Sequence, residues 1–558
     1  MSAQPAPDPI DGDLDAQLDA LAGAADPPED DVRTARAALA RAALVAALAL
    51  GVLGDALLHE GITGIAFPLW IAVSLAVVVA LAWRRADRLR TEQALWMGLA
   101  LLFASALAWR DEEALQVFDV FGVVACLAML GMTFAGTPVA SVLAARVRDL
   151  VRVAARTVVD GVTGVVPLAL VDADWQGLAA RLPRHRALPL VRAAVITLPL
   201  LLVFGALLRS ADPMFAALLA LPALDVEVVV SHVVLTAFLA WAVGGWMRGA
   251  LVSPRPPQEH ADRRLLSLGA LEVSTVLGAL AGLFALFVLV QLRWLFGGEA
   301  LVQRTTGLSY AQYARRGFFE LMWVALLTVP VLLGLHAAVP ETDSGTRRRY
   351  RVLGGVVLTL LGAMLVSAAG RMQLYIRFYG LSTDRFYASA IMVWAAVVLL
   401  WFAATVLRER PRTFAAGMAL SALAVLAALN VLDPARLVAS VNIARGPVAV
   451  SRLGNERSVD YAYLASLGAD PVGVLVPALV RGTGATSTAA SDRERCTAAS
   501  RLVRRWADAD ARDMEEWDWR RWNASRARAR AVVRANETAL RRLAAAPVCR
   551  VARPNVTR

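Results

Sequence analysis

The chain has 558 residues, of which 58% are hydrophobic and only 18% are charged, with a formal net charge of +11 and a mean hydropathy of +0.56. A soluble protein carries about 25% charged residues, whereas here long apolar runs alternate with short arginine-bearing loops. The composition therefore excludes a soluble protein and predicts an all-α, polytopic transmembrane helix bundle.

All 57 basic residues are arginine, and the chain contains no lysine. This excludes the phosphate-binding loop of nucleotide hydrolases, the kinase lysine and Schiff-base cofactors, because each of these needs the lysine amine. The sequence also has no CxxC motif and no histidine–cysteine cluster. We therefore expect no cofactor, no metal and no catalytic residue of a known motif.

Residues 1–31 contain nine acidic residues and no basic one, which predicts a disordered acidic tail on the cytoplasmic side. A transmembrane domain follows over 32–432, with about eleven apolar runs of the length that crosses a bilayer. The predicted spans are 39–58, 67–83, 94–109, 117–134, 188–208, 226–247, 268–292, 317–339, 352–376, 386–407 and 413–432. Two shorter stretches, 158–171 and 213–224, favour interfacial or re-entrant segments, and their roles stay open.

Residues 433–558 form a basic C-terminal segment with 22 arginines against 13 acids. After the linker Gly482–Ser491, a helical stretch runs from about 492 to 546. Its tryptophans are expected to form one apolar face: Trp506, Trp517, Trp519 and Trp522. We predict a small helical module here, with a disulfide between Cys496 and Cys549 if the module lies in an oxidising compartment.

The distribution of arginine predicts the orientation. With a cytoplasmic N-terminus, 26 of the 35 arginines before residue 433 fall on the cytoplasmic side, in line with the positive-inside rule. An odd number of spans then makes the C-terminal module extracytoplasmic, and one missed span would reverse its side. The predicted partners are the lipid bilayer and, for the arginine-rich tail, anionic lipid or an acidic envelope polymer; no nucleic acid is expected.

Charged and polar groups inside or near the bilayer are the candidate functional residues. With the predicted topology these residues gather toward the outer side of the membrane. They are either snorkelling residues and structural ion pairs at the interface, or parts of a binding site. This polar cluster comprises Glu227, His232, Gln291, Arg293, Tyr310, Tyr313, Glu320, Arg371, Arg377 and Asp384. Glu320 and Arg371 have opposite charges on consecutive spans and are expected to pair. Glu272 is the exception, an inner-side carboxylate one turn into its span.

The run Asp111-Glu112-Glu113 follows the third span. Such a compact acidic cluster could hold a divalent cation or supply a general base. The favoured interpretation is solvated loop charge, because most acidic triplets in loops have no further role.

Two segments resemble the signature regions of a bacterial multi-spanning membrane family known as a domain of unknown function, the 4153/4173 group. They are the loop Phe296–Glu320 and the segment Arg371–Tyr387. Asp460–Leu464, Trp519–Asn523, Val290–Arg293 and the surroundings of Glu272 are similar to the family as well, so that the resemblance covers roughly 265–530. It implies a protein of the bacterial cytoplasmic (inner) membrane and supplies no reaction.

Three functions stay open. The leading hypothesis is a non-catalytic envelope sensing or assembly protein with an outward-facing polar patch, which fits the missing catalytic motifs. The second is a proton-coupled secondary transporter in which Glu272 or His232 carries protons, although we find no inverted repeat. The third is an outward-facing transferase that uses a lipid-linked donor, with Asp111, Glu112 and Glu113 as base and metal ligands.

Overall fold

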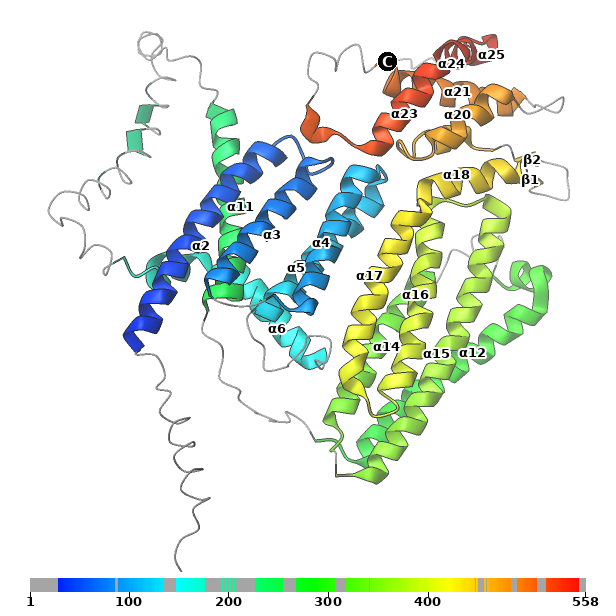
Figure 1. The fold of residues 1–558 in the computed structure, drawn as a ribbon. Coiled ribbons are helices and arrows are strands. Elements are labelled where there is room, and N and C mark those ends of the chain that lie inside the picture. Colours follow the sequence, from blue (N-terminus) through cyan, green and yellow to red (C-terminus); the bar gives the residue numbers. More distant parts are fainter. Residues whose placement is uncertain are drawn as a thin grey trace, which may run out of the picture. The chain divides into compact units, whose positions relative to one another are not determined.

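A computed structural model describes most of the chain as helix (Figure 1). The described residues are 29–85, 89–134, 147–175, 226–253, 267–306, 318–340, 342–446, 448–449, 456–457, 459–482, 489–508 and 518–550, with isolated helical positions between 193 and 208. Side chains are described for these residues except 29–32, 148–150, 152–154, 292–306, 318–320, 448–449, 456–457, 489–490 and a few single positions. The acidic tail up to residue 28, the predicted span 188–208 and the short stretch 213–224 lie outside the described residues or almost entirely so.

Ten helices in the described ranges are long and apolar enough to cross a membrane. They confirm the predicted all-α polytopic bundle, and each overlaps one predicted span. The helices that contain them are α2 (Glu29–Leu58), α3 (Ala66–Arg84), α4 (Thr91–Trp109), α5 (Glu113–Phe134), α11 (Val226–Met247), α12 (Ala270–Thr306), α14 (Phe318–Ala338), α15 (Ser344–Tyr379), α16 (Thr383–Thr405) and α17 (Phe414–Leu432). The chain is therefore a multi-pass integral membrane protein.

The chain divides into two compact units, and the first comprises 1–56, 76–88 and 157–254. This first unit contains the end of α6 (Val147–Thr163), which leads through α7 (Val165–Pro167) into a π-helical turn over Leu168–Asp172, so the short stretch 158–171 is helical. Gly245 of α11 lies against this segment so closely that a β-carbon there would be 2.3 Å from the carbonyl oxygen of Gly161. The buried carboxylate of Asp172 pairs with Arg36 and Arg248, both at 2.7 Å.

The second unit comprises 57–75, 89–156 and 255–558. Its spanning helices share a core to which α12, α14, α15, α16 and α17 contribute. In this core the rings of Phe402 and Phe414 meet edge to face at 5.2 Å, and the buried Tyr350 donates its hydroxyl hydrogen to the carbonyl oxygen of Leu332 at 2.8 Å. Short turns join consecutive spans, as where Gly380, with φ of 78°, ends α15 and Ser382 begins α16.

The C-terminal residues of the second unit form a small helical module with its own core. Its elements are α18 (Pro434–Arg445), β1 (Val448–Ala449), β2 (Glu456–Arg457), α19 (Tyr461–Leu464), α20 (Val472–Arg481), α21 (Ala489–Trp506), α23 (Ala524–Ala535), α24 (Glu537–Ala544) and α25 (Pro547–Arg550). The two strands pair antiparallel. A disulfide joins Cys496 of α21 to Cys549 of α25, with their α-carbons 6.1 Å apart.

One expectation about this module is wrong. Trp506 is buried in the module core, but Trp519 and Trp522 are 45% and 43% exposed, so the tryptophans do not share one apolar face. The reason is that α21 ends at Trp506, and residues 519–521 form a separate 3-10 turn whose orientation the helical period does not set. Trp517 lies outside the described residues.

Candidate functional site

A buried ionic network begins at Arg110, the residue that follows α4. Arg110 is 5% exposed, and its Nη1 donates to Oδ2 of Asp433 at 2.6 Å while its Nε donates to the carbonyl oxygen of Asn430 at 2.8 Å. Asp433 connects α17 to α18 with a φ of 56°, and its Oδ1 accepts from the backbone N–H of Arg436 at the start of α18. The α4–α5 turn is thereby attached to the end of the last span by a pair with little access to water.

Asp111 extends the network into the C-terminal module. Its Oδ1 accepts from Nε of Arg526 at 2.5 Å, and its Oδ2 accepts from the backbone N–H of Ala469 at 2.9 Å. Its own N–H donates to Oδ2 of Asp470 at 2.9 Å, and the other oxygen of Asp470 accepts the hydroxyl of Ser525. Burial, with the charge of Asp433 nearby, raises the pKa of Asp470 to about 6.

The remaining acids of this turn have separate roles. Glu112 accepts from the backbone N–H of Leu115 at 2.8 Å and from the hydroxyl of Tyr387, while burial raises the pKa of Glu112. Glu113 is exposed. The interpretation of this run as solvated loop charge is therefore wrong for Asp111 and Glu112, because the C-terminal module and α16 cover them. The carboxylates of Asp111 and Glu112 contact different partners and do not converge on one shared site.

Asn523 connects the same turn to α23. Its side-chain amide donates to the carbonyl oxygens of Leu107 and Arg110 at 2.9 and 2.8 Å, and its Oδ1 accepts from the N–H groups of Ser525 and Arg526. One side chain thus satisfies carbonyls at the end of α4 and N–H groups at the start of α23, which are the groups that a helix leaves without intrahelical partners.

Below this network, inside the membrane-spanning part of α5, lies a second buried pair. Asp119 is fully buried, and its Oδ1 accepts from Nδ2 of Asn430 on α17 at 2.6 Å. Nδ2 of Asn430 also donates to the carbonyl oxygen of Leu426 at 3.1 Å. An ionisable group inside a span is a candidate functional residue by default.

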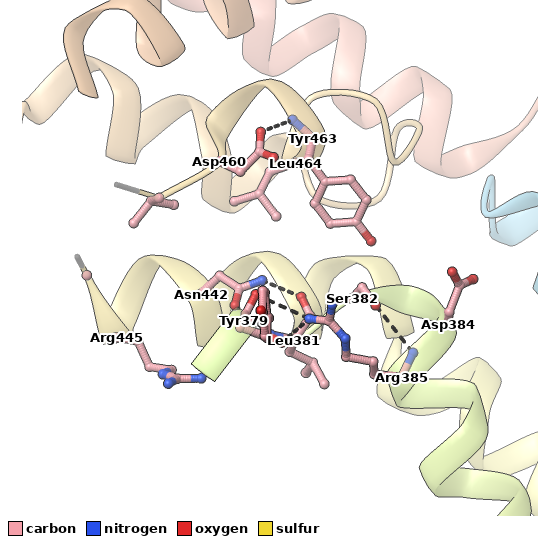
Figure 2. Close-up of a pocket in the computed structure, with 13 residues that line it drawn as sticks. Tyr379, Leu381, Ser382, Asp384, Arg385, Asn442, Arg445, Asp460, Tyr463 and Leu464 are labelled. Atoms are coloured by element: carbon pink, nitrogen blue, oxygen red, sulfur yellow. Dashed lines mark hydrogen bonds between the residues drawn. The ribbon is translucent and has the colours of Figure 1, made fainter. Parts of the chain in front are cut away.

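A pocket of about 340 Å³ opens beside the module, where the α15–α16 turn meets α18 and α19 (Figure 2). Asn442 of α18 closes one wall by holding the backbone of Leu381, accepting its N–H at 2.9 Å and donating to its carbonyl oxygen at 2.6 Å. On the opposite wall, Tyr463 of α19 accepts from the backbone N–H of Thr383 at 3.0 Å. Two segments that carry the family resemblance, Arg371–Tyr387 and Asp460–Leu464, contribute most of the residues that line the pocket, and the C-terminal end of α18 with its cap contributes most of the rest.

The two arginines of the pocket are engaged by backbone carbonyls. Arg385 donates to Gly380 at 2.6 Å, and its guanidinium lies 4.1 Å from the ring centre of Tyr375. Arg445 donates to the carbonyl oxygens of Ile376 and Arg377 at the end of α15, at 2.7 and 2.5 Å. Asp384, by contrast, is exposed and has no hydrogen bond or ion pair with any residue that the structure describes.

The structure places the predicted polar cluster as follows. Asp384 lines the pocket, Arg377 is exposed near the end of α15, and Arg371 is half-buried on α15. Gln291 is buried on α12 and accepts the hydroxyl of Ser367. The side chains of Arg293, Tyr310, Tyr313 and Glu320 lie outside the described ones, so the pairing of Glu320 with Arg371 stays a prediction. Glu272 is exposed in the first turn of α12.

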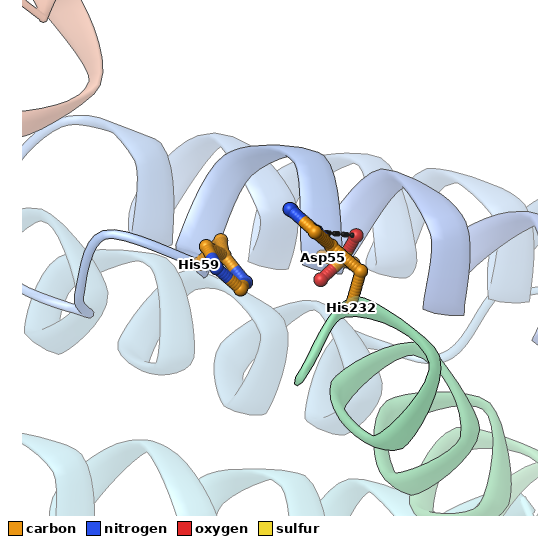
Figure 3. Close-up of side chains that lie close together, drawn as sticks. All are labelled: Asp55, His59 and His232. Atoms are coloured by element: carbon orange, nitrogen blue, oxygen red, sulfur yellow. Dashed lines mark hydrogen bonds and ion pairs between the residues drawn. The ribbon is translucent and has the colours of Figure 1, made fainter. Parts of the chain in front are cut away.

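Glu227 and His232 belong to the first unit. Glu227 is exposed in the first turn of α11. His232 is half-buried, and its Nδ1 lies 2.7 Å from Oδ2 of Asp55 on α2 (Figure 3). This contact joins two spanning helices of that unit, and a shared proton or a His–Asp ion pair both fit it.

The candidates predicted from the sequence do not include Asp119 and Asp55. Asp119 and Asp55 lie inside the predicted spans 117–134 and 39–58, so the rule that charged residues in spans are functional candidates would have found both. Asp470 and Asn523 carry no such signal, because nothing in their local sequence separates them from other polar residues of a basic tail.

Comparison with known proteins identifies one family. The family model described as Domain of unknown function (DUF4153) matches residues 97–478, which is more than half of the chain. The match starts nearer the N-terminus than the resemblance in the sequence and includes the α4–α5 turn, the pocket and Asp470. No curated protein and no solved structure matches the chain.

Proposed function

The chain belongs to the DUF4153 family, and from this premise we propose that it is a membrane-embedded receptor whose pocket binds a small solute with a cationic amine. The observation that carries the proposal is the pocket between the α15–α16 turn, α18 and α19. Its volume of about 340 Å³ falls in the range of small-ligand sites, which is about 300–1,000 Å³. A ligand bound there would contact residues of the spanning helices α15 and α16 and residues of the module at the same time.

The preference for a cation follows from the hydrogen-bonding groups that remain. Each guanidinium, Arg385 and Arg445, donates to backbone carbonyls, whereas the carboxylate of Asp384 is exposed and has no partner among the described residues. Asp460 accepts the N–H of Tyr463 and also contacts the carboxyl of Glu494. The carboxylate of Asp384 thus remains for a ligand that donates hydrogen bonds, and the tyrosine rings in the pocket wall favour a cation further.

The buried network supports a receptor in which the module follows the helix ends. Arg110, Asp111 and Asn523 join the α4–α5 turn to the end of α17, to the residues before α20 and to the start of α23, through contacts that are largely shielded from water. Such contacts have defined geometry and do not slide continuously, since a buried charge that loses its partner is strongly destabilising. A shift of the α15–α16 turn on ligand binding would act on the module through the contacts of Asn442 with Leu381 and of Tyr463 with Thr383.

We further propose that the protein resides in a bacterial inner membrane with a cytoplasmic N-terminus and an extracytoplasmic module. The disulfide between Cys496 and Cys549 supports this, because disulfides persist in oxidising compartments. The exposed Trp519 and Trp522 beside Arg521 resemble an interfacial belt, and we propose contact with anionic lipid or an acidic envelope polymer there.

The test uses the purified full-length protein in detergent. Ethanolamine and spermidine should raise its melting temperature, whereas inorganic phosphate and glucose at the same concentration should not. Asp384→Asn should weaken amine binding by about 10–100-fold, since a charge-assisted hydrogen bond contributes about 1.5–3 kcal/mol. Glu409→Gln, an exposed acid after the other end of α16, is the matched control. Stabilisation by phosphate or glucose, or equal amine binding in Asp384→Asn, would refute the cation site.

Proton-coupled transport is the second candidate function, and Asp119 is the observation that favours it. A fully buried carboxyl inside a spanning helix is typical of proton-relay positions. In proteoliposomes, proton movement on addition of amine that disappears in Asp119→Asn would support transport, and amine binding without any proton movement would support the receptor.

A further inference from the structure

We propose that Asp119 is a proton-binding site: it is held as a neutral carboxylic acid that pairs with the side-chain amide of Asn430. This inference does not depend on the proposed receptor function. It starts from the contact between α5 and α17, where Asp119 is 0% and Asn430 5% exposed. Nδ2 of Asn430 donates to Oδ1 of Asp119 at 2.6 Å, so the two planar groups are already joined on one side.

The second atoms of both groups are acceptors without donors. Oδ2 of Asp119 and Oδ1 of Asn430 are buried and have no hydrogen-bond partner among the residues described. Exchanging the oxygen and nitrogen of Asn430 would not repair this, because Nδ2 also donates to the carbonyl oxygen of Leu426 at 3.1 Å. A proton on Oδ2 of Asp119 turns one acceptor into a donor, and the carboxylic acid and the amide can then satisfy each other with two hydrogen bonds.

The surrounding charges do not replace the water that a buried carboxylate loses. The nearest cation, Arg110, attracts a negative charge at Asp119, but it donates its hydrogen bonds to Asp433 and to the backbone of Asn430 rather than to Asp119. The other titratable groups near Asp119 are Glu112 from the α4–α5 turn and Tyr387 from α16. A carboxylate cannot gain from either of them, because one is an acid and the other donates to Glu112.

The helices packed against Asp119 bring one further cation into its vicinity, and that cation is engaged elsewhere. The helix α17 contains no charged residue, and the one charged residue of α4, Glu92, lies in its first turn, at the opposite end from the α4–α5 turn. Arg385 of α16 donates to the carbonyl oxygen of Gly380. Five carboxyls of the buried network face three arginines: Asp111, Glu112, Asp119, Asp433 and Asp470 face Arg110, Arg505 and Arg526. An excess of acids without access to water is accommodated by protonation rather than by unpaired charge.

Release of the proton would place an unpaired carboxylate between α5 and α17. That change occurs directly beneath the bond between Arg110 and the carbonyl of Asn430. Proton occupancy of Asp119 is therefore coupled to the contact between the last span and the α4–α5 turn, and so to the attachment of the module.

The experiment is infrared difference spectroscopy of the full-length protein in lipid nanodiscs, with aspartate labelled by carbon-13 in its carboxyl group. At neutral pH the wild type should show the carbonyl stretch of a protonated, label-shifted carboxylic acid. This band should be absent from Asp119→Asn, which mimics the neutral acid, and present in Asp384→Asn, whose acid is exposed. Raising the pH should remove the band and lower the melting temperature of the wild type more than that of Asp119→Asn.

A second variant keeps the test decisive if Asp119→Asn does not fold. In Asn430→Ala the acid loses its partner, so the band should shift in frequency or disappear. A spectrum at neutral pH without any protonated aspartate would overturn the proposal. So would a band that stays unchanged in both Asp119→Asn and Asn430→Ala.

Discussion

Replacing Arg110 with methionine removes the cation that joins the α4–α5 turn to the start of α18, while a side chain of similar length still fills part of the space. Arg110 and Asp433 are 6% and 9% exposed at their side chains, so water cannot replace the lost partner. Breaking a buried pair by removing one member costs about 3–5 kcal/mol. We expect the upper part of this range, because Asp433 and Asp470 are then left facing each other; Nη1 of Arg110 lies 3.9 Å from Asp470.

Removing the other partner should cost less. Asp433→Asn keeps the cap on α18 and tolerates the φ of 56° at this position, and Asp470 remains near the guanidinium. We expect about 1–3 kcal/mol for this variant. In the double variant Asp470 no longer faces a charged Asp433, so the cost should fall below the sum of the single costs by about 2 kcal/mol.

The assay is unfolding by sodium dodecyl sulfate in mixed micelles, followed by tryptophan fluorescence. Arg528→Met is the control, because Arg528 is exposed on α23 and an exposed substitution changes stability by about 0.5 kcal/mol or less. Equal unfolding of Arg110→Met and Arg528→Met would refute the reasoning. Strict additivity of the two single costs would show that the two side chains do not act as a pair.

Three further predictions test the module. Gly64→Ala should detach the loop before α3 from residues 520–521, because the new β-carbon would lie 2.6 Å from the carbonyl oxygen of Arg520. The control is Gly61→Ala, because Gly61 also has a positive φ but lies in open space. Equal melting temperatures of the two variants would contradict the close contact. Asp470→Asn should gain stability relative to wild type as the pH rises from about 4 to 6. Folded wild type keeps the Asp470 proton up to a pKa of about 6, whereas the unfolded chain releases it near 3.8, so wild type loses up to about 3 kcal/mol of stability in that window. Parallel pH profiles of the two melting temperatures would refute this. Cys549→Ser should destabilise the module by up to about 4 kcal/mol, because the disulfide closes a loop of 53 residues; alkylation of both thiols in unreduced wild type would show that the bond is absent.

The buried network has a consequence for how the family should be studied. A truncation after α17 would remove Asp470 and Asn523 together with the module, and it would leave Arg110 and Asp111 without most of their partners. Loss of function in such a truncation would therefore not separate a role of the module from collapse of the α4–α5 turn. Point substitutions at the pocket, which lies beside this network, are the better probes.

The sequence by itself determined the membrane-spanning character of this protein and the approximate bounds of ten described spans. The physical reason is that a bilayer imposes a local requirement: about 20 consecutive apolar residues in a helix that satisfies its own backbone. The same locality explains why the family resemblance was visible in Arg371–Tyr387, since the turn and the helix ends of the pocket lie within one short segment.

Only the tertiary structure decided which polar residues meet. Asn523 contacts the carbonyl oxygen of Arg110 across 413 positions of sequence, and Asp111 contacts Arg526 across 415. An acidic triplet in a loop is solvated or buried depending on what folds over it, and no local pattern in Asp111–Glu113 encodes the module that does so. Asp119 lies between these cases. The sequence shows that it stands inside a span, but its hydrogen-bond partner Asn430 belongs to another helix, and only the structure shows that, among the described residues, the pair lacks one donor.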